Sequence, residues 1–480
     1  MFGRKVILCD ETEITPENIV EVLQSALLSH TQNSYDCDRL YEYYKGNQPI
    51  LNRVKEIRPE ICNKIVENRA NEIVSFKVGY LCGEPIQYVS RGTTEEVSDG
   101  IGKLNDSMLL CGKAAKDKEL AEWMYICGTG YRMIIPNSVY INTEIIPKLQ
   151  NRETDFMEDE APFEVYTLDP RSTFVVYHSG LGEKPLMGVK YITKENRATV
   201  YSVYTRDAYY EIANDEPYGA LTIKKSELRG FKEVPIVEYP LNSARLGAFE
   251  VVTPILDAIN SVQSNRLDGI EQFIQSMLVL VNADIDDEAV KYIREAGLVK
   301  LKSMGDNKSS IEVIAEELDQ QQTQTLVDYM YQTVLNIVGM PNRNGGKSTS
   351  DTGSAVVMRD GWEAAEARAK SDELMFKEAE RKFVKMVLKI MCDTVGTTLR
   401  LADIETKFTR RNYENILAKS QVLVSMLAND KIDPKLAFTH CGMFSDPEDA
   451  AKMSAEHYAE VMSMVEQTAT PPQEGDNAAS

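Results

Sequence analysis

The sequence lacks the residue patterns on which most enzymes and metalloproteins depend. Its four histidines are scattered over 480 residues, and its eight cysteines include no C-x-x-C pair. A zinc site needs several such ligands at short spacings. No serine, cysteine or lysine stands in a motif that supplies an activating base. The sequence therefore predicts a protein that is not an enzyme, with no catalytic residue, no metal site and no cofactor.

Basic residues are scarce relative to acidic ones. The chain has 53 lysines and arginines against 74 aspartates and glutamates, a formal net charge of −21. Proteins that grip nucleic acid carry basic stripes that neutralise phosphates. The charge balance argues against tight DNA binding. It is compatible with solubility alone, or with a surface past which DNA slides without being held.

Long apolar runs are also missing. No segment approaches the roughly 20 apolar residues of a membrane span, and the N-terminal residues turn acidic before a signal-peptide core could form. The sequence predicts no membrane association, a cytoplasmic setting, and cysteines that remain reduced and mostly buried. At 480 residues and 43% hydrophobic content, the chain exceeds the roughly 250–300 residues of a single core. Two or more modules are expected.

The hydrophobic period changes along the chain. Residues from Thr15 to about Cys127 read mainly as helices, and residues 131–239 as an antiparallel β region rich in β-branched and aromatic residues. Two amphipathic helices follow, at 253–277 and 316–338. Between them, 278–315 reads as a small β-α-β-β segment. The sequence therefore predicts a compact insert between the two helices.

The C-terminal third is again helical. Residues 354–393 have apolar side chains at alternating spacings of three and four, with no proline and one glycine. At about 1.5 Å per residue, this predicts a helix of roughly 60 Å. Two shorter helices are predicted at 412–427 and 446–465. The composition of 467–480 predicts a disordered tail.

A Gly-rich loop, 339–353, contains Gly346-Lys347-Ser348, which resembles the end of a phosphate-binding loop. That motif needs a glycine five positions before Gly346, where this chain has Pro341, which has no backbone N–H to donate. The loop also follows a helix where the motif requires a strand. These departures argue against nucleotide binding, although an NTPase that uses Lys347 stays as a rival hypothesis.

The acidic run at Asp284, Asp286 and Asp287 is the other candidate for chemistry. Clustered carboxylates can hold Mg²⁺, as a metal-dependent nuclease would require. The simpler interpretation is that Asp286 caps the helix after it and that Asp287 interacts favourably with the helix dipole. The sequence offers no second acidic motif to complete a nuclease site.

Short motifs recur in a fixed order along the chain and carry a family resemblance. They include Tyr43-Tyr44-Lys45-Gly46, Asn63-Lys64-Ile65-Val66-Glu67-Asn68, Lys77-Val78-Gly79-Tyr80-Leu81-Cys82-Gly83-Glu84-Pro85, Asp169-Pro170-Arg171, Val234-Pro235-Ile236-Val237-Glu238-Tyr239-Pro240, Ile259-Asn260, Gly339-Met340-Pro341 and Phe444-Ser445-Asp446-Pro447-Glu448. In this order the chain resembles the SPP1-like class of portal proteins of tailed bacteriophages. The loop departs from the family in its many Gly, Ser and Thr residues.

The resemblance implies an α+β portal fold with named parts. These are a mixed α/β wing (1–245), a first stem helix (246–277), a small α/β clip (278–315), a second stem helix (316–338), a tunnel loop (339–353), a long kinked helix (354–395), a return to the wing with helical crown (396–466), and a disordered tail (467–480).

The resemblance also implies a function and partners. A homo-oligomeric, dodecameric ring would pass double-stranded DNA without sequence specificity during packaging and ejection. It would meet the terminase large subunit, the head-tail connector and capsid or scaffold proteins, first in the host cytoplasm and then at the portal vertex of the virion. A different ring-forming connector protein is the other structural alternative.

Two sets of residues are the candidate sites. Arg343, Asn344, Lys347 and Ser348 of the tunnel loop are predicted to face DNA. Polar residues of the two stem helices are predicted to line the channel or to contact neighbouring subunits, namely Asn260, Gln263, Ser264, Gln321 and Gln324.

Overall fold

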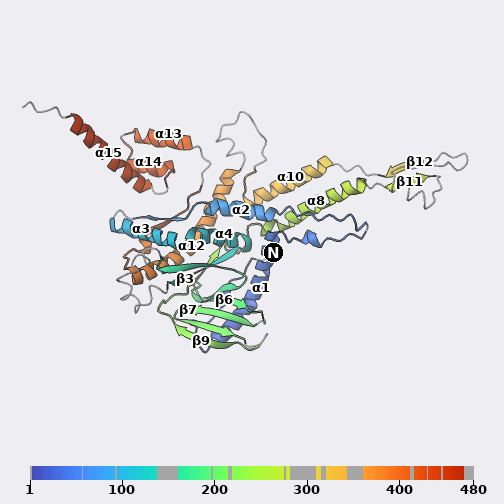
Figure 1. Ribbon diagram of the computed structural model, residues 1–480, viewed down its shortest axis with the longest axis horizontal. Helices are drawn as coiled ribbons and strands as arrows, with labels where there is room; N and C mark the ends of the chain where they lie inside the picture. Colours follow the sequence, from blue (N-terminus) through green and yellow to red (C-terminus); the bar gives the residue numbers. More distant parts are fainter. Residues whose placement is uncertain are drawn as a thin grey trace, which may run out of the picture. The chain divides into compact units, whose positions relative to one another are not determined.

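The computed structural model describes most of the chain. The described residues are 3–56, 58–91, 95–137, 160–195, 198–214, 219–274, 277–281, 310–314, 320–342, 361–410, 416–429, 431–444 and 447–469 (Figure 1). The chain divides into two compact units. Unit 1 comprises Met1–Tyr41, Glu72–Val251 and Gly339–Ser480, and unit 2 comprises Glu42–Asn71 and Val252–Val338.

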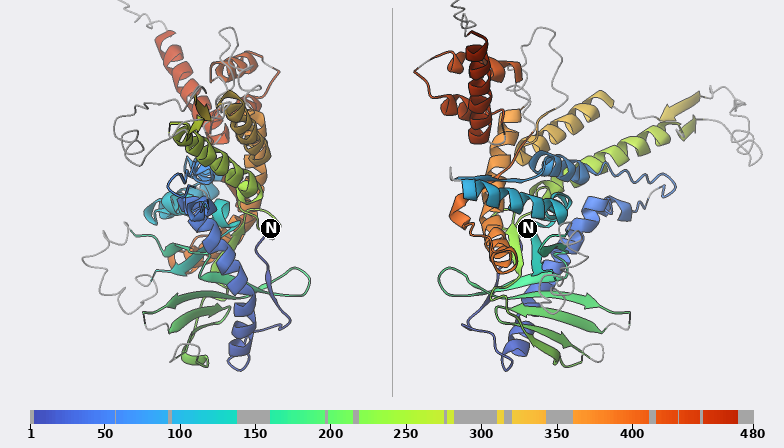
Figure 2. Two further views of the ribbon diagram at one scale, coloured as in Figure 1. Left: turned by 90° about the vertical axis from the view of Figure 1, so that its right-hand side faces the viewer. Right: turned by 60° about the vertical axis from the view of Figure 1, so that its left-hand side comes forward.

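A six-stranded sheet forms much of unit 1. Its order is β1 (Ile7–Cys9), β5 (Thr173–His178), β6 (Pro185–Thr193), β7 (Thr199–Thr205), β8 (Ala208–Ala213) and β9 (Thr222–Leu228). Strand β1 runs parallel to β5, and the remaining pairs are antiparallel. Helix α1 (Ile19–Lys45) lies across one face (Figure 2). Its residues Ile19, Leu23 and Ala26 pack in one core with Val189 and Val203.

A second sheet in unit 1 has helices on one face, and Tyr131, Met133 and Ile236 of its other face pack with Val175 of the six-stranded sheet. It has the order β10 (Ile236–Pro240), β3 (Thr129–Pro136) and β4 (Phe163–Leu168), all antiparallel. Helices α4 (Lys113–Cys127) and α12 (Trp362–Val395) pack on it. A two-stranded sheet pairs β2 (Gln87–Ser90) with β13 (Ile404–Lys407), and α3 (Glu95–Leu110) packs on β2. Helix α2 (Arg69–Cys82) precedes β2 in the chain.

Helix α12 is the longest helix of the described chain, at 34 residues. At about 1.5 Å per residue it runs roughly 50 Å. Its buried residues recur at spacings of three and four, as at Phe376, Phe383 and Val387, and they face the second sheet. The helix predicted from 354 is thus confirmed from Trp362 onward, while 354–360 lie outside the described residues.

Three helices follow α12: α13 (Ile416–Leu427), α14 (Pro434–Cys441) and α15 (Pro447–Ala469). Helix α14 contacts both of the others and was not predicted. Asp433 caps it by accepting a hydrogen bond from the Lys435 amide, with Pro434 in the first turn, a signal that the sequence did carry. Helix α15 continues to Ala469, so the prediction of disorder from 467 was wrong for its first three residues.

Unit 2 is built on a helix pair. Helices α8 (Thr253–Ile274) and α10 (Gln320–Val338) lie side by side (Figures 1 and 2), and strands β11 (Met277–Val281) and β12 (Ser310–Ile314) pair antiparallel. Short 3-10 helices occur at η1 (Pro49–Asn52), η2 (Glu250–Val252) and η3 (Leu401–Asp403). The predicted helices and these two strands are confirmed. The helix predicted at 286–296 and the strand at 298–301 lie outside the described residues.

Among the helices that the structure describes, none is both long and apolar enough to cross a membrane. Within the same part of the chain, no cluster of three or more histidine, cysteine, aspartate or glutamate side chains is arranged to hold a metal ion.

Candidate channel and assembly site

A line of buried polar residues runs along α8. Asn260, Ser264 and Asp268 recur every four residues, so they lie one above another on a single face of the helix. Each is 2% exposed or less. Buried polar groups need partners. Here the partners come from residues 62–68, which have no regular secondary structure.

The partners are backbone amides at every second residue. The Asn63 amide donates to Asp268 Oδ1 at 2.7 Å, and the Ile65 amide donates to Ser264 Oγ at 2.9 Å. The Glu67 amide donates to Asn260 Oδ1 at 3.0 Å. Two residues of extended chain advance by about 6.6 Å and four residues of helix by about 6.0 Å, so the two repeats stay in step. The helix thus takes the place of a neighbouring strand for residues 63–67.

Charge reinforces one end of this contact. Asp268 Oδ2 lies 2.8 Å from Lys55 Nζ and 3.0 Å from an Arg53 guanidinium nitrogen. Burial by itself raises the pKa of Asp268, but hydrogen bonds from Lys55 and Asn63, together with the charge of Arg53, outweigh burial and leave the pKa lowered. Asp268 is therefore ionised and paired at neutral pH.

The other end of the contact is held by side-chain amide and hydroxyl groups. The Gln48 amide accepts from Asn260 Nδ2 at 2.5 Å and donates to the Tyr43 carbonyl and to Asn68 Oδ1, each at 3.2 Å. The Tyr43 hydroxyl donates to Asp257 at 2.8 Å. These contacts place two of the family motifs, Tyr43 to Gly46 and Asn63 to Asn68, on α8.

The location of these contacts corrects two predictions. Residues 42–71 were assigned to the wing, but they belong with α8 and α10 in unit 2. Asn260 and Ser264 were predicted to line a channel or to face a neighbouring subunit, but both are buried against residues of their own chain. The prediction of a polar stripe on α8 was correct. The prediction of what contacts this stripe was wrong, because periodicity does not reveal which segment covers a helix face.

The other residues predicted to line a channel or to contact a neighbour have different positions. Gln263 donates to Glu67 Oε1 at 2.6 Å. Gln324 accepts from Arg266 at 2.6 Å, which links α10 to α8, and Gln321 is exposed in the first turn of α10. The structure brings Gln263 into the contact with 62–68 and keeps Gln324 between the two helices.

Unit 2 also exposes apolar side chains. Leu326, Tyr329 and Ile337 of α10 are 49%, 69% and 40% exposed, and Ile270 of α8 is 40% exposed. Exposed apolar residues grouped on helices are typical of a surface that meets another protein. Part of the apolar stripe of α10 is therefore exposed in the described part of the subunit.

The predicted tunnel-loop residues Arg343, Asn344, Lys347 and Ser348 lie outside the described residues. Residues 339–342 are described, and the chain is described again from Gly361. A Cβ atom built on Gly361 would lie 3.9 Å from the Cα of Pro341, so these two described positions lie close together. Gly339 has a φ of +67°, and Trp362 packs on Phe76 and Tyr80 of α2, with ring centroids 6.2 Å apart in each pair. Both anchors of the loop are therefore held by packed residues.

A buried charge cluster anchors α12, the helix that follows the loop. Glu380 of α12 lies 3.1 Å from Arg132 of β3 and 3.0 Å from Lys113 of α4. Asp117 of α4 pairs with both cations. All four side chains are at most 4% exposed, and two cations face two carboxylates. The cluster is neutral as a whole.

Two tyrosines complete this cluster. The hydroxyls of Tyr88 and Tyr239 donate to the two oxygens of Glu380, at 2.5 Å and 2.7 Å. Burial by itself raises the pKa of Glu380, but Lys113, Arg132 and the two hydroxyls outweigh it and lower the pKa to about 2. Sequence reasoning missed Glu380, although a glutamate between Phe376 and Phe383 on an apolar helix face was a visible signal.

Replacing Ser264 by alanine is expected to destabilise unit 2. The change leaves the Ile65 amide without its acceptor, and an unsatisfied buried donor costs about 1–3 kcal/mol. Ser261, on the same helix, is exposed and serves as the matched control, for which we expect less than ~0.5 kcal/mol. Hydrogen exchange of the 60–68 peptide is the measurement. Equal protection in Ser264→Ala and Ser261→Ala would contradict the assigned contact.

Comparison with known proteins adds to this geometry. Residues 27–463 match the model of the family described as "Phage portal protein, SPP1 Gp6-like". The portal protein of Bacillus phage SPP1 is 19% identical over 335 residues, which cover 64% of this chain and 65% of that protein, just under two thirds of its length. A solved structure titled "Neck of empty GTA particle computed with C6 symmetry" covers 78% of this chain and 90% of its own at 9% identity, with a TM-score of 0.43.

The family match extends over both compact units. It includes the α8–α10 pair, the two anchors of the Gly-rich loop and the whole of α12. The motifs Tyr43 to Gly46 and Asn63 to Asn68, which carried the resemblance, are the segments that contact α8. The chain belongs to the SPP1 Gp6-like family of phage portal proteins.

Proposed function

We propose that this chain is the subunit of a portal ring, dodecameric in the virion, through which double-stranded DNA is packaged and later ejected. The observation that carries the proposal is the family match over residues 27–463. The uncovered apolar side chains of α10 support it, because a ring subunit needs surfaces for two neighbours.

The helix pair α8 and α10 is proposed as the stem around the channel. Arg266 and Gln324 join the two helices, and the contact with residues 62–68 supports α8 along its polar line. A stem braced in this way resists bending while DNA moves. In this proposal Gln321 is an exposed stem residue in the first turn of α10.

The segment 278–315 is proposed as the clip. Strands β11 and β12 form its described base. We propose that it docks the terminase large subunit during packaging and the head-tail connector afterwards. Capsid or scaffold proteins would surround the wing, and the ring would pass from the host cytoplasm to the portal vertex of the virion.

The tunnel loop, 339–353, is proposed as the part that faces DNA. Arg343 and Lys347 are the only cations of its 342–353 stretch. DNA presents one negative charge per roughly 1.7 Å, so a few cations per subunit make weak contacts that do not depend on sequence. The net charge of −21 keeps the rest of the protein from gripping the duplex.

The double replacement Arg343→Ala with Lys347→Ala tests the loop. We expect rings at the wild-type yield and a change of about two- to tenfold in the fraction of heads that fill or retain DNA, because only the weak phosphate contacts are lost. Electron microscopy of purified rings and the length of packaged DNA are the measurements. Lys184→Ala with Lys194→Ala, two exposed cations of unit 1, is the matched control.

Two outcomes would overturn parts of this proposal. A protein that never forms rings with an axial hole, at any concentration or salt, would overturn the portal function. Rings that form normally while the loop variant packages and retains DNA like the wild type would overturn the role of the loop.

A further inference from the structure

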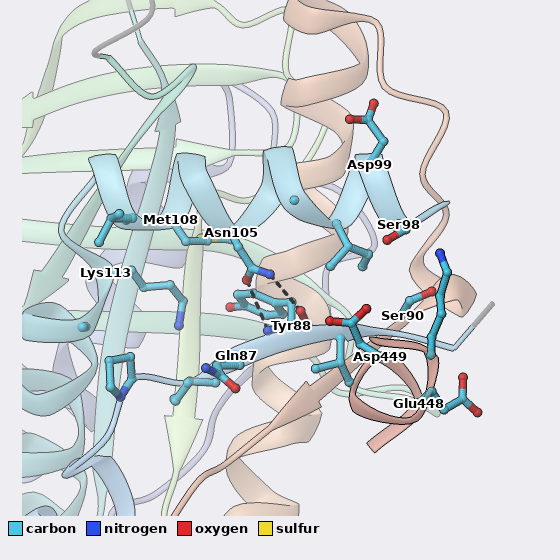
Figure 3. Close-up of a pocket in the computed structure, with 18 of the residues that line it drawn as sticks. Gln87, Tyr88, Ser90, Ser98, Asp99, Asn105, Met108, Lys113, Glu448 and Asp449 are labelled. Carbon is cyan, nitrogen blue, oxygen red and sulfur yellow. Dashed lines mark hydrogen bonds between the residues drawn. The ribbon is translucent and has the colours of Figure 1, made fainter. Parts of the chain in front are cut away.

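A large groove lies in unit 1. Helix α3, strand β2 and the start of α4 form one side, and α14 with the first turns of α15 form the other. Its volume is about 1640 Å³. Figure 3 shows Asn105 and Met108 of α3 beside Tyr88 of β2, with Glu448 and Asp449 of α15 at the rim. Hydrogen bonds between the Asn105 side chain and the Tyr88 backbone, at 2.9 Å and 3.3 Å, hold α3 on β2.

The lining of the groove is mainly apolar. Ile86, Ile101, Met108, Leu109, Pro434 and Ala451 contribute to it, and Leu109 is 79% exposed. Small-molecule pockets usually measure about 300–1,000 Å³ and enclose most of the ligand. A helix about 10 Å wide occupies roughly 400 Å³ per turn, so this groove has room for about three to four turns. Its size therefore fits a helix better than a small molecule.

The same subunit exposes a helix of matching chemistry. Every side chain from Lys452 to Met464 of α15 is exposed. Five of them are large and apolar, namely Met453, Tyr458, Val461, Met462 and Met464, with exposures from 41% to 65%. On a helical projection they gather on one half of the helix. Short helices are marginal in water without packing, so this half is expected to be covered by a protein surface.

A ring supplies such a surface by symmetry. Neighbours in a ring meet through two different patches of the same chain, one from each subunit. An uncovered apolar groove and an uncovered apolar helix on one chain provide such a pair. The exposed part of α15 spans about three turns, which agrees with the room in the groove.

We propose that the 452–464 part of α15 from one subunit packs in the α3–β2–α14 groove of the next subunit of the ring. The proposal rests on the proposed function for the existence of the ring. The proposal adds which two surfaces of neighbouring subunits contact each other.

Charge determines how this interface responds to salt. The groove is lined by the acids Asp99, Asp117, Asp433, Glu448 and Asp449 and by the cations Lys113, Lys435 and Lys452. Lys113 pairs with Asp117 in the buried cluster, and Lys452 belongs to α15 itself. The incoming helix carries Glu456 and Glu460. Like charges therefore meet around an apolar centre, and screening them favours the contact. We expect ring formation to strengthen between ~0.05 M and ~0.5 M NaCl.

Cross-linking tests the contact directly. Full-length protein with Leu109→Cys and Met462→Cys, in a background where exposed Cys392 is serine, is treated with a short bismaleimide. We expect a ladder of covalent oligomers from assembled rings and none from either single variant. The control pairs Met462→Cys with Leu181→Cys, which is fully exposed outside the groove and gives no ladder.

A charge substitution gives the second measurement. Val461→Glu is expected to raise the concentration at which rings dissociate by about tenfold or more, equal to ~1.4 kcal/mol, since a buried unpaired charge opposes the contact. The Tm of the dissociated subunit stays unchanged because Val461 is exposed there. Ser463→Glu, on the opposite side of α15, is the matched control and leaves assembly intact.

The outcomes separate this inference from the function on which it rests. Intact rings that give no ladder, or that tolerate Val461→Glu, overturn the interface and leave the portal function in place. A protein that forms no rings in any condition overturns both. Rings with the ladder and with selective loss in Val461→Glu support both.

Discussion

Replacing Glu380 by glutamine is expected to lower the free energy of unfolding of unit 1 by about 3–5 kcal/mol, because it removes one carboxylate from a buried cluster of two carboxylates and two cations. Arg132 and Lys113 would keep only Asp117 as a counter-ion, in a region where all four side chains are at most 4% exposed. The glutamine also accepts hydrogen bonds from Tyr88 and Tyr239 less strongly than a carboxylate does. A fall in Tm of roughly 10 °C is the corresponding thermal effect.

The pH dependence of this variant follows from the direction of the shift. The folded protein holds the pKa of Glu380 at about 2, below the ordinary value of 4.5. A depressed carboxyl pKa contributes stability that is present above the ordinary value and is lost as pH falls through the folded value. The wild type is therefore expected to lose this contribution between about pH 4.5 and 2, and Glu380→Gln is expected to lack that part of the acid dependence.

Glu378 provides the control for both measurements. It lies on the same helix, two residues away, and is exposed. Glu378→Gln should change Tm by no more than ~2 °C. If the two variants unfold at the same temperature, or if the acid dependence of Glu380→Gln matches that of the wild type, the buried cluster does not stabilise α12 as we infer.

The second large effect is expected at Gly128. This residue ends α4 with a left-handed φ of +77°, and its amide donates to the Met124 carbonyl at 2.8 Å. A Cβ atom at Gly128 would lie 2.1 Å from the carbonyl oxygen of Arg245. That carbonyl cannot easily move, because the Arg245 side chain pairs with Glu238 at 2.8 Å and the Arg245 amide donates to Asn242.

Gly128→Ala should therefore destabilise unit 1 by about 2–5 kcal/mol, from backbone strain of ~1–2 kcal/mol and a steric clash of ~1–3 kcal/mol. Gly112, before the first residue of the same helix, separates the two contributions. Its φ is also left-handed, at +65°, but no atom lies within 4 Å of an added Cβ. Gly112→Ala should cost only the strain, ~1–2 kcal/mol. Thermal unfolding of both variants measures the difference, and equal losses would show that the Arg245 carbonyl yields.

The local sequence was sufficient to predict whether most segments form helices or strands. The spacing of three and four along 354–393 predicted α12, which is described from Trp362, and the β-branched segments between 131 and 239 predicted strands that the structure contains. Proline after threonine at Thr253 placed the start of α8 correctly. These predictions succeeded because helix and strand periods are properties of neighbouring residues.

Short elements with distant partners were not predictable. Strand β1 has three residues, and it exists because β5, more than 160 residues later in the chain, accepts it as a parallel edge. Strands β2 and β13 depend on each other in the same way. A strand of four or fewer residues is too short to show a clear alternation of apolar and polar residues. It therefore cannot be predicted before its partner strand is known.

For the charged and polar residues, too, some features follow from the sequence and others only from the tertiary structure. The sequence by itself determined that α8 has a polar line, that α12 has an apolar face, and that the ordered motifs belong to one family. Only the tertiary structure decided that Asn260 and Ser264 serve residues 65–67 of their own chain, and that Glu380 meets Arg132 across 248 positions. Periodicity states which face of an element is buried or polar. What covers that face depends on the path of the whole chain, because the contacts form between segments whose separation in sequence carries no local signal.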